Sequence, residues 1–246
     1  MTKSTRSVTI PMLSLGVLLL AGTCQAQTRP PEVEQLAKTY GLDSYGQIEA
    51  VRYTFNLDLP ALKVNLSRSW TWEPKTGQVM YETKDKDGKP VKVTYNRSQL
   101  NTAPANVKDE IEPAFVNDNY WFIFPFHAYW DTSANVTVKD KQKLPIGQGT
   151  AKLVSVTYPA EVGGYTPGDT WDLYVGKDGR IVQFFYHRGG PKKPSLLPAT
   201  WAGYKKAGPL LVSTDHRGTA DGKPARIFFT NVAVKLTGSD KWVDAQ

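Results

Sequence analysis

The sequence contains a single cysteine, Cys24, which lies in the N-terminal segment. The rest of the chain therefore has no disulfide and no thiol nucleophile. Packing has to stabilise the protein instead, and an aromatic content of 11% supplies large side chains for that purpose. A length of 246 residues suits one domain, in the size range of β sandwiches and barrels.

Recognisable catalytic and cofactor-binding motifs are also lacking. The chain has no Gly-Xaa-Ser-Xaa-Gly elbow, no phosphate-binding glycine loop and no Rossmann fingerprint. Its histidines, His127, His187 and His216, fall in three different segments and do not have the spacing of a metal site. No pair of acidic residues is placed for general acid–base work. We therefore expect no enzyme, no cofactor and no metal.

Long blocks of one charge are absent as well. The net charge is +7, and its basic residues are spread along the chain without an interleaved set of base-stacking aromatics. This distribution predicts no nucleic-acid partner. The charge leaves open a weak attraction of the protein to an anionic membrane surface.

An apolar run covers residues 10–21, with Lys3 and Arg6 before it. The run has about 12 residues, whereas a membrane-spanning helix needs about 20. The sequence Cys24-Gln25-Ala26 then places small residues three before and one before a cut after Ala26. This order predicts a cleavable signal peptide over residues 1–26 and a periplasmic or secreted mature chain without a transmembrane segment.

Two alternatives to cleavage after Ala26 stay open. One is an uncleaved anchor. The other is a lipoprotein attached through Cys24, because residues 20–22 resemble the run that precedes a lipoprotein cysteine, although Thr23 interrupts it. After the signal we expect a leader with a short helix over residues 27–44 and a single β domain over residues 45–246.

Alternation of apolar and polar side chains dominates that domain. It is cleanest over residues 51–59 and is repeated over residues 64–72, with turn residues at 73–77 and a hairpin turn at Asp87-Gly88. Further strands are predicted at 78–84, 91–95, 135–139, 151–158, 171–175, 181–188, 210–217 and 226–236. About ten strands and few helices indicate a mainly β fold, one large curved antiparallel sheet in an unclosed half-barrel.

Two or three short helices are expected to cover the concave face of this sheet. Residues 31–40 and 107–115 have apolar residues at helical spacing, and Pro113 is expected to weaken the end of the second helix. Residues 191–198 are predicted to be a loop, followed by a short helix or turn at 200–206. Residues 120–130 are strongly aromatic but contain Pro125, which argues against a central strand, so we expect a lid.

Aromatic side chains mark the candidate ligand site. They form either a filled core or the lining of an apolar cavity. Arg68 lies among them, and a buried cation needs a partner, which is an internal acid, a ligand headgroup or water at a strand edge. The cavity-lining candidates lie on two neighbouring strands and on the aromatic segment; they are Tyr53, Phe55, Arg68, Trp70, Trp72, Trp121, Phe124, Phe126 and Trp130.

Four stretches resemble the outer-membrane lipoprotein-sorting-protein group, which has the LolA/LolB fold, and a poorly characterised domain family within it. They are NDNYWFIFPF at 117–126, YTPGDTWDLYV at 165–175, GRIVQFFY at 179–186, and WAGYK at 201–205 followed by GPL at 208–210. The resemblance implies an incomplete barrel with helices across its opening and a cavity for acyl chains or another lipid. It makes Arg68 a candidate for the cationic residue of the carrier's cavity.

These observations predict an exported carrier that binds a hydrophobic ligand, such as a lipid or a lipoprotein acyl chain. A further partner would be another protein of the cell envelope. The alternative is a non-enzymatic structural or interaction module of the envelope, with a filled core and no ligand.

Overall fold

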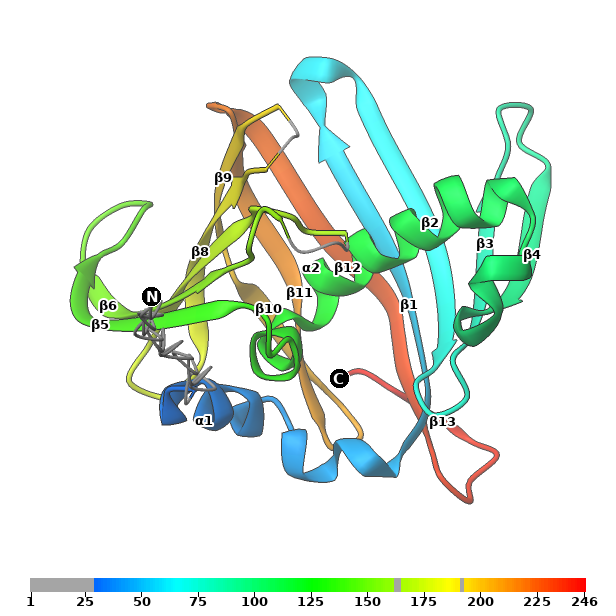
Figure 1. The fold of residues 1–246 in the computed structure, drawn as a ribbon, viewed down its shortest axis with the longest axis horizontal. Coiled ribbons are helices and arrows are strands. Elements are labelled where there is room, and N and C mark those ends of the chain that lie inside the picture. Colours follow the sequence, from blue (N-terminus) through cyan, green and yellow to red (C-terminus); the bar gives the residue numbers. More distant parts are fainter. Residues whose placement is uncertain (1–28, 162–164, 191–192) are drawn as a thin grey trace, which may run out of the picture.

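The structure is a computed structural model that describes residues 29–161, 165–190 and 193–246. The expected signal peptide, with Cys24, lies outside these residues. Within them, thirteen antiparallel strands form one sheet that curls around a long helix without closing into a barrel (Figure 1). The mainly β, half-barrel fold predicted from the alternation is therefore confirmed.

The strand order across the sheet is β4-β3-β2-β1-β12-β11-β9-β8-β7-β6-β5, with β10 paired to β11 and β13 to β12. The strands are β1 (Ile48–Leu59), β2 (Val64–Glu73), β3 (Gln78–Lys84), β4 (Pro90–Asn96), β5 (Asn135–Lys143), β6 (Thr150–Thr157), β7 (Thr170–Val175), β8 (Ile181–Arg188), β9 (Ser195–Thr200), β10 (Ala202–Ala207), β11 (Leu210–Ala220), β12 (Lys223–Leu236) and β13 (Trp242–Asp244).

The register between neighbouring strands decides which side chains face the concave side of the sheet. On β1 and β2, Tyr53 pairs with Trp70 and Val51 with Trp72, and all four are buried. Because side chains alternate between the two faces of a strand, this register places the aromatic residues of both strands on the concave face together.

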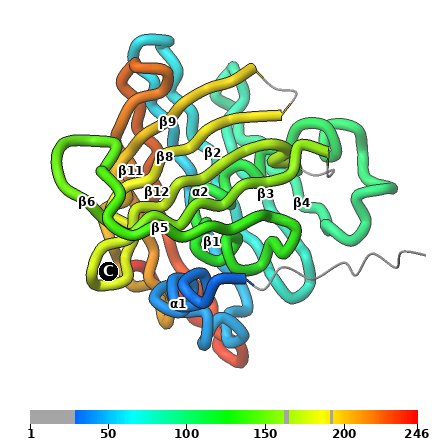
Figure 2. The backbone as a smooth tube through the Cα atoms, turned by 60° about the vertical axis from the view of Figure 1, so that its left-hand side comes forward, coloured from blue at the N-terminus to red at the C-terminus, as the bar shows by residue number. Residues whose placement is uncertain are grey.

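Two α helices complete the fold. Helix α2 (Glu112–Trp130) lies across the concave face, and α1 (Pro31–Thr39) packs at one end of the half-barrel, below strands β5 and β6 in the turned view (Figures 1 and 2). Shorter turns are the 3-10 segments η1 (Leu42–Gln47), η2 (Pro60–Leu62) and η3 (Arg97–Thr102) and the π turn η4 (Val107–Ile111). Among the described helices, none has the length and apolarity needed to cross a membrane.

The helix expected at 107–115 is present, but it does not end near Pro113: it continues as α2 through residues 120–130, where a separate lid was expected. Pro113 lies in the first turn of α2, directly after the π turn η4. Pro125 lies inside the helix and is accommodated by non-helical backbone angles at Ile123. The helix is apolar on nearly all sides, which is typical of a buried helix.

The loop at 191–198 and the helix or turn at 200–206 were also wrong. Strands β9 and β10 cover most of these residues, with Trp201 buried between them. Pro198 pairs with Phe185 of β8, while β9 meets β11 only at Gly218 and Ala199 in the strand register. Proline is tolerated at this position because β9 pairs so little with β11 that few hydrogen bonds on that side need the N–H that proline lacks.

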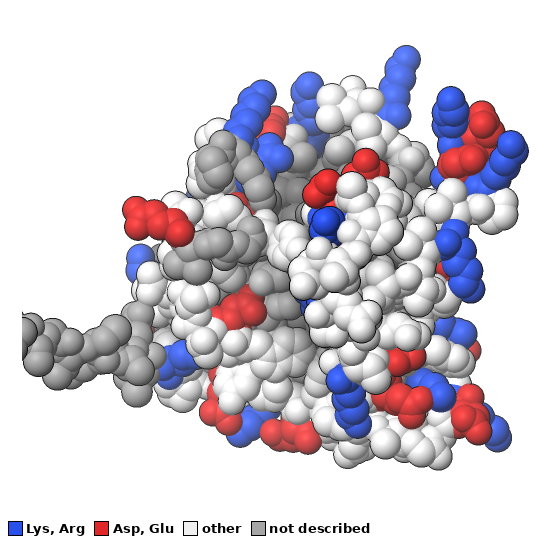
Figure 3. All heavy atoms as spheres, turned by 45° about the vertical axis from the view of Figure 1, so that its right-hand side comes forward, with Lys and Arg blue, Asp and Glu red and all other residues white. Residues whose placement is uncertain are grey.

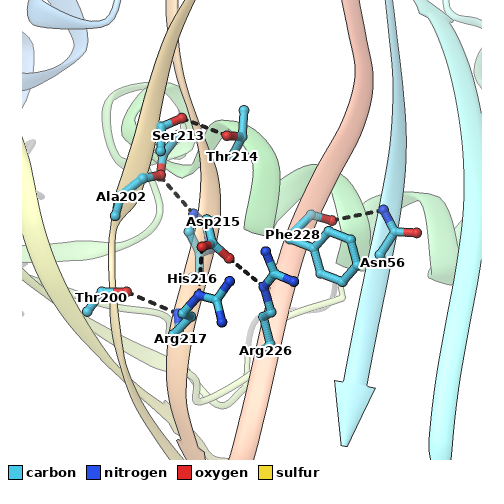
Figure 4. A network of polar contacts seen from close by, with 11 residues as sticks. Asn56, Thr200, Ala202, Ser213, Thr214, Asp215, His216, Arg217, Arg226 and Phe228 are labelled. Carbon is cyan, nitrogen blue, oxygen red and sulfur yellow. Dashed lines mark hydrogen bonds and ion pairs between the residues drawn. The ribbon is translucent and has the colours of Figure 1, made fainter.

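The convex face is held by polar contacts between β11 and β12 (Figure 4). Asp215 accepts hydrogen bonds of 2.7 Å from Nε of both Arg217 and Arg226. Burial acts to raise the pKa of Asp215, but the hydrogen bonds from Arg226 and Arg217 outweigh it and lower that pKa below its ordinary value. His216, the next residue along β11, points to the opposite face and is buried in the core.

Candidate ligand-binding site

Helix α2 fills the part of the concave face that lies over β1 to β4. Phe115 packs edge-on against Trp70 and Trp72, with ring centroids 5.4 and 5.8 Å away. About two turns further along, Phe122 stacks on Tyr53 at 4.3 Å. The aromatic residues that the sequence offered as cavity walls on β1 and β2 therefore contact the helix.

A buried ion pair ties the middle of α2 to β2. The Arg68 guanidinium donates to both oxygens of Asp118, at 2.8 Å from Nε and 2.5 Å from Nη2, and Trp70 Nε1 donates to the same carboxylate at 2.8 Å. The Asp118 side chain is fully buried and that of Arg68 is 17% exposed. Burial raises the pKa of Asp118, and Arg68 opposes this effect. Of the partners considered for Arg68, the structure shows the internal acid.

A second buried carboxylate ties the beginning of α2 to β4 and η3. Glu112 accepts hydrogen bonds from Tyr95 Oη at 2.6 Å and from Arg97 Nε at 2.9 Å. Its side chain is fully buried. We call this side of the molecule, where α2 covers β1 to β4, the closed half. Each buried carboxylate there meets an arginine.

On its other side, α2 faces β7, β8 and the loop before β7, and here a pocket of about 350 Å³ remains. We call it the aromatic pocket. The described residues that line it come from α2, from the loop and from the two strands; they are Pro113, Val116, Asn117, Tyr120, Trp121, Tyr165, Thr166, Asp169, Trp171 and Tyr186.

Three rings form the heart of the aromatic pocket. Trp121 of α2, Trp171 of β7 and Tyr186 of β8 have ring centroids 4.5 to 5.1 Å apart and are tilted against one another by 55° to 71°. Trp171 also stacks on Phe124 at 4.1 Å, which fixes its ring plane. Its indole Nε1 is buried and has no hydrogen-bond partner among the described residues.

Asp169 is the only acidic residue among the described lining residues, and it is 2% exposed. Its carboxylate accepts hydrogen bonds of 2.9 Å from Tyr186 Oη and from the backbone N–H of Gly189. Close packing of two backbone turns holds it there. A Cβ on Gly168 would lie 2.3 Å from the backbone nitrogen of Gly190, so glycine is required at this approach.

The C-terminal end of α2 is held by a third carboxylate, Asp131. It accepts hydrogen bonds from Tyr120 at 2.6 Å and from Tyr158 at 2.7 Å. Burial acts to raise the pKa of Asp131, but the interaction with His127 and the two phenols outweighs it and lowers that pKa. His127 stacks on Tyr120 at 3.8 Å and bonds Asn119, so it acts as packing in this helix end.

The structure separates the residues that the sequence grouped as one site. Of the nine candidates, Trp121 alone belongs to the described residues that line the aromatic pocket. Tyr53, Phe55, Phe124 and Phe126 are buried in the core, and Trp130 packs against Phe126 and Tyr45 at the end of α2. Arg68, Trp70 and Trp72 belong to the closed half.

Sequence reasoning missed most of the pocket lining. Asp169 and Trp171 lie in the stretch 165–175, and Tyr186 ends the stretch 179–186, both of which carry the family resemblance. That resemblance was the available signal. It could not place the stretches beside Trp121, because their separation in sequence is long and alternation does not report which strands face a helix.

The three histidines lie on three different elements, α2, β8 and β11. His187 and Ser155 both bond Asp172, so the acid lies between the hydroxyl and the imidazole and the serine lacks the base that would activate it. No cluster of three metal-ligating side chains is found among the described residues.

A second cleft, of about 590 Å³, lies between α1, the β5–β6 hairpin and the turn after β7. Its floor is apolar, with Leu36, Val154 and Val175, and its rim mixes acidic and basic side chains. Lys152 there lies 3.8 Å from Glu32 and 3.9 Å from Asp140. Lys152 thus lies between the two acidic side chains of the rim.

No family model matches the sequence, and no curated protein matches it either. Among solved structures, the chain is similar to a DUF1329 family protein from Desulfovibrio piger, with 9% identity and a TM-score of 0.43 over 85% of this chain and 94% of that one. It is also similar to a LolA superfamily protein from Nitrosomonas europaea, with 8% identity and a TM-score of 0.46 over 82% and 91%. Both likenesses concern the fold alone.

Proposed function

We propose that the protein is a non-enzymatic carrier that binds a hydrophobic ligand, such as a lipid or acyl chain, in the aromatic pocket. The observation that carries the proposal is the pocket itself. Its volume of about 350 Å³ and its mostly apolar, aromatic lining are typical of small-ligand sites. The unpartnered indole N–H of Trp171 supports it further, because a buried donor favours a ligand or water that accepts its hydrogen bond.

In this proposal α2 is a fixed wall of the site. Glu112, Asp118 and Asp131 tie the beginning, the middle and the end of the helix to other elements. Lifting the helix would expose buried charges and several aromatic rings, and each ring favours burial by about 1.5–3 kcal/mol. The ligand therefore enters beside the helix, at the rim where Tyr165 is 41% exposed.

The second candidate is the envelope module with a filled core. The packing of Phe115 against Trp70 and Trp72 favours it, because the space that a large cavity would use is occupied in the closed half. Such a module contacts another envelope protein through its surface and takes up no ligand.

Titration with N-phenyl-1-naphthylamine, a neutral probe that fluoresces in apolar sites, separates the two candidates. The carrier is expected to bind it saturably, and Val116→Trp is expected to abolish binding by filling the pocket without unfolding the domain. Val182→Trp is the matched control, because Val182 is 39% exposed on β8 and does not line the pocket. Unsaturable binding in the wild type supports the filled module, whereas equal saturable binding in both variants would place the binding site outside the aromatic pocket.

Export belongs to the same proposal. We expect the mature chain to begin at Gln27 and to reach the periplasm or the medium, with residues 45–246 as its single β domain. N-terminal sequencing of the exported protein checks this expectation. A blocked N-terminus with a lipid on Cys24 would establish the lipoprotein alternative instead.

A further inference from the structure

We infer that the aromatic pocket selects amphiphiles whose polar end is an alkylammonium cation. The inference rests on the proposed function of the pocket, and it adds the chemical class of the ligand. Three observations support it: the charge of the lining, the hydrogen bonding of Asp169, and the arrangement of the three rings.

The described residues that line the pocket carry one negative charge and no positive charge. Asp169 is the acidic residue of the pocket, and the described lining residues include no lysine, arginine or histidine. Within the described part of the chain, no basic side chain lies within ion-pair distance of its carboxylate. Figure 3 shows many basic side chains at the periphery of the face that it displays, with acidic and basic side chains also nearer its centre.

Asp169 keeps room for another partner. An ionised carboxylate offers about four acceptor positions, and Asp169 uses two of them, for Tyr186 Oη and the N–H of Gly189. Both donors are neutral. The buried carboxylates of the closed half, Glu112 and Asp118, are instead each bonded by an arginine. A buried charge without a counter-ion is unfavourable, so a cationic ligand would supply the counter-ion that the described lining residues do not.

The three rings beside this carboxylate are suited to a cation. Alkylammonium groups bind to the faces of aromatic rings, and tryptophan is the strongest of these partners. Trp121, Trp171 and Tyr186 present rings in three different planes, and Tyr186 itself bonds Asp169. The apolar side of the pocket, with Val116 and Pro113, would then hold the first part of an alkyl chain.

Two arginines near the rim are engaged elsewhere. Arg97, whose charge acts on Tyr165, donates to Glu112. Arg188, whose charge acts on Tyr186, donates from Nε to the carbonyl of Lys193 at 2.7 Å. Neither is a described lining residue of the pocket.

Calorimetric titration of the full chain with two probes of equal length, dodecylammonium, whose head group donates N–H bonds, and dodecanoate, tests the inference. Both are used below their micelle concentrations. The ammonium is expected to bind at least about tenfold more tightly. Asp169→Asn should bring the ratio close to one, while Asp215→Asn on the convex face, a matched carboxylate-to-amide change, should leave the ratio unchanged.

Equal or tighter binding of dodecanoate by the wild type overturns this inference and leaves the carrier proposal standing. Saturable binding of neither probe overturns both. If Asp169→Asn loses its near-ultraviolet circular dichroism and so does not fold, Tyr186→Phe serves as the second variant. That change removes a neutral donor and keeps the carboxylate, so the preference for ammonium must persist, and its loss would overturn the inference.

Discussion

The two halves of the concave face show opposite solutions to burying a carboxylate. In the closed half, Glu112 and Asp118 meet Arg97 and Arg68, and aromatic rings from α2 and the sheet pack around them. In the half with the aromatic pocket, Asp169 is buried almost as deeply, and its donors among the described residues are a phenol and a backbone N–H.

This difference separates structural polar groups from binding ones. A paired and fully bonded charge fixes one helix on one sheet. A carboxylate that lacks a counter-ion and lies at a pocket is suited to receive one. Four measurements, ordered from the largest expected effect to the smallest, test whether this distinction holds.

The largest effect is expected from Asp118→Ala in the closed half. Removing this carboxylate leaves the Arg68 guanidinium, 17% exposed, without its partner and leaves Trp70 Nε1 without its acceptor. Breaking one side of such a pair costs about 3–5 kcal/mol of the free energy of unfolding. Denaturant unfolding measures it, and the double variant Arg68→Met, Asp118→Leu should recover most of the loss. A loss below about 1 kcal/mol would show that the pair does not hold α2.

Two matched tyrosine changes compare the halves directly. Tyr186→Phe removes one of two donors to Asp169 and is expected to cost about 1.5–3 kcal/mol of unfolding free energy. Tyr95→Phe removes a donor to Glu112, but Arg97 still bonds that carboxylate, so a smaller loss is expected. Thermal and denaturant unfolding of both variants checks the order. An equal loss in the two would contradict the contrast between the halves.

A pH effect is expected from His216, which is buried against Trp201 with ring centroids 4.2 Å apart. Burial lowers the pKa of His216 from 6.5 to about 3. Below about pH 6.5 the unfolded chain therefore binds a proton that the folded chain does not, so this contribution to stability falls as the pH falls. Between pH 7 and 5 the loss is about 2 kcal/mol. Unfolding of His216→Phe over this range should lack that contribution and show a correspondingly shallower slope.

The smallest effect is expected on the convex face. Arg217 is largely exposed, and Asp215 keeps its bond to Arg226 when Arg217 is replaced. Arg217→Ala should therefore change the free energy of unfolding by no more than about 0.5 kcal/mol. Denaturant unfolding at low and high salt checks it. A loss comparable to that of Asp118→Ala would mean that exposure does not distinguish these ion pairs.

Much of the sheet could be predicted from the sequence because alternation is a local signal. The predicted strand at residues 181–188 coincides with β8, and residues 51–59 and 64–72 lie within β1 and β2. Helical spacing marked residues 107–115, but the rest of α2 escaped detection because nearly all of its sides are apolar and it contains Pro125. Strand β9 escaped because Pro198 resembles a loop residue.

By itself, the sequence determined the half-barrel, its concave aromatic face and the need for a partner at Arg68. Tertiary structure alone decided that this partner is Asp118 and that the remaining pocket gathers Trp121, Trp171 and Tyr186 around Asp169. The physical reason is the distance along the chain over which each property is determined. Alternation of side chains is set by each strand's own geometry, whereas the balance of a buried charge depends on groups far apart in the chain that only folding brings together.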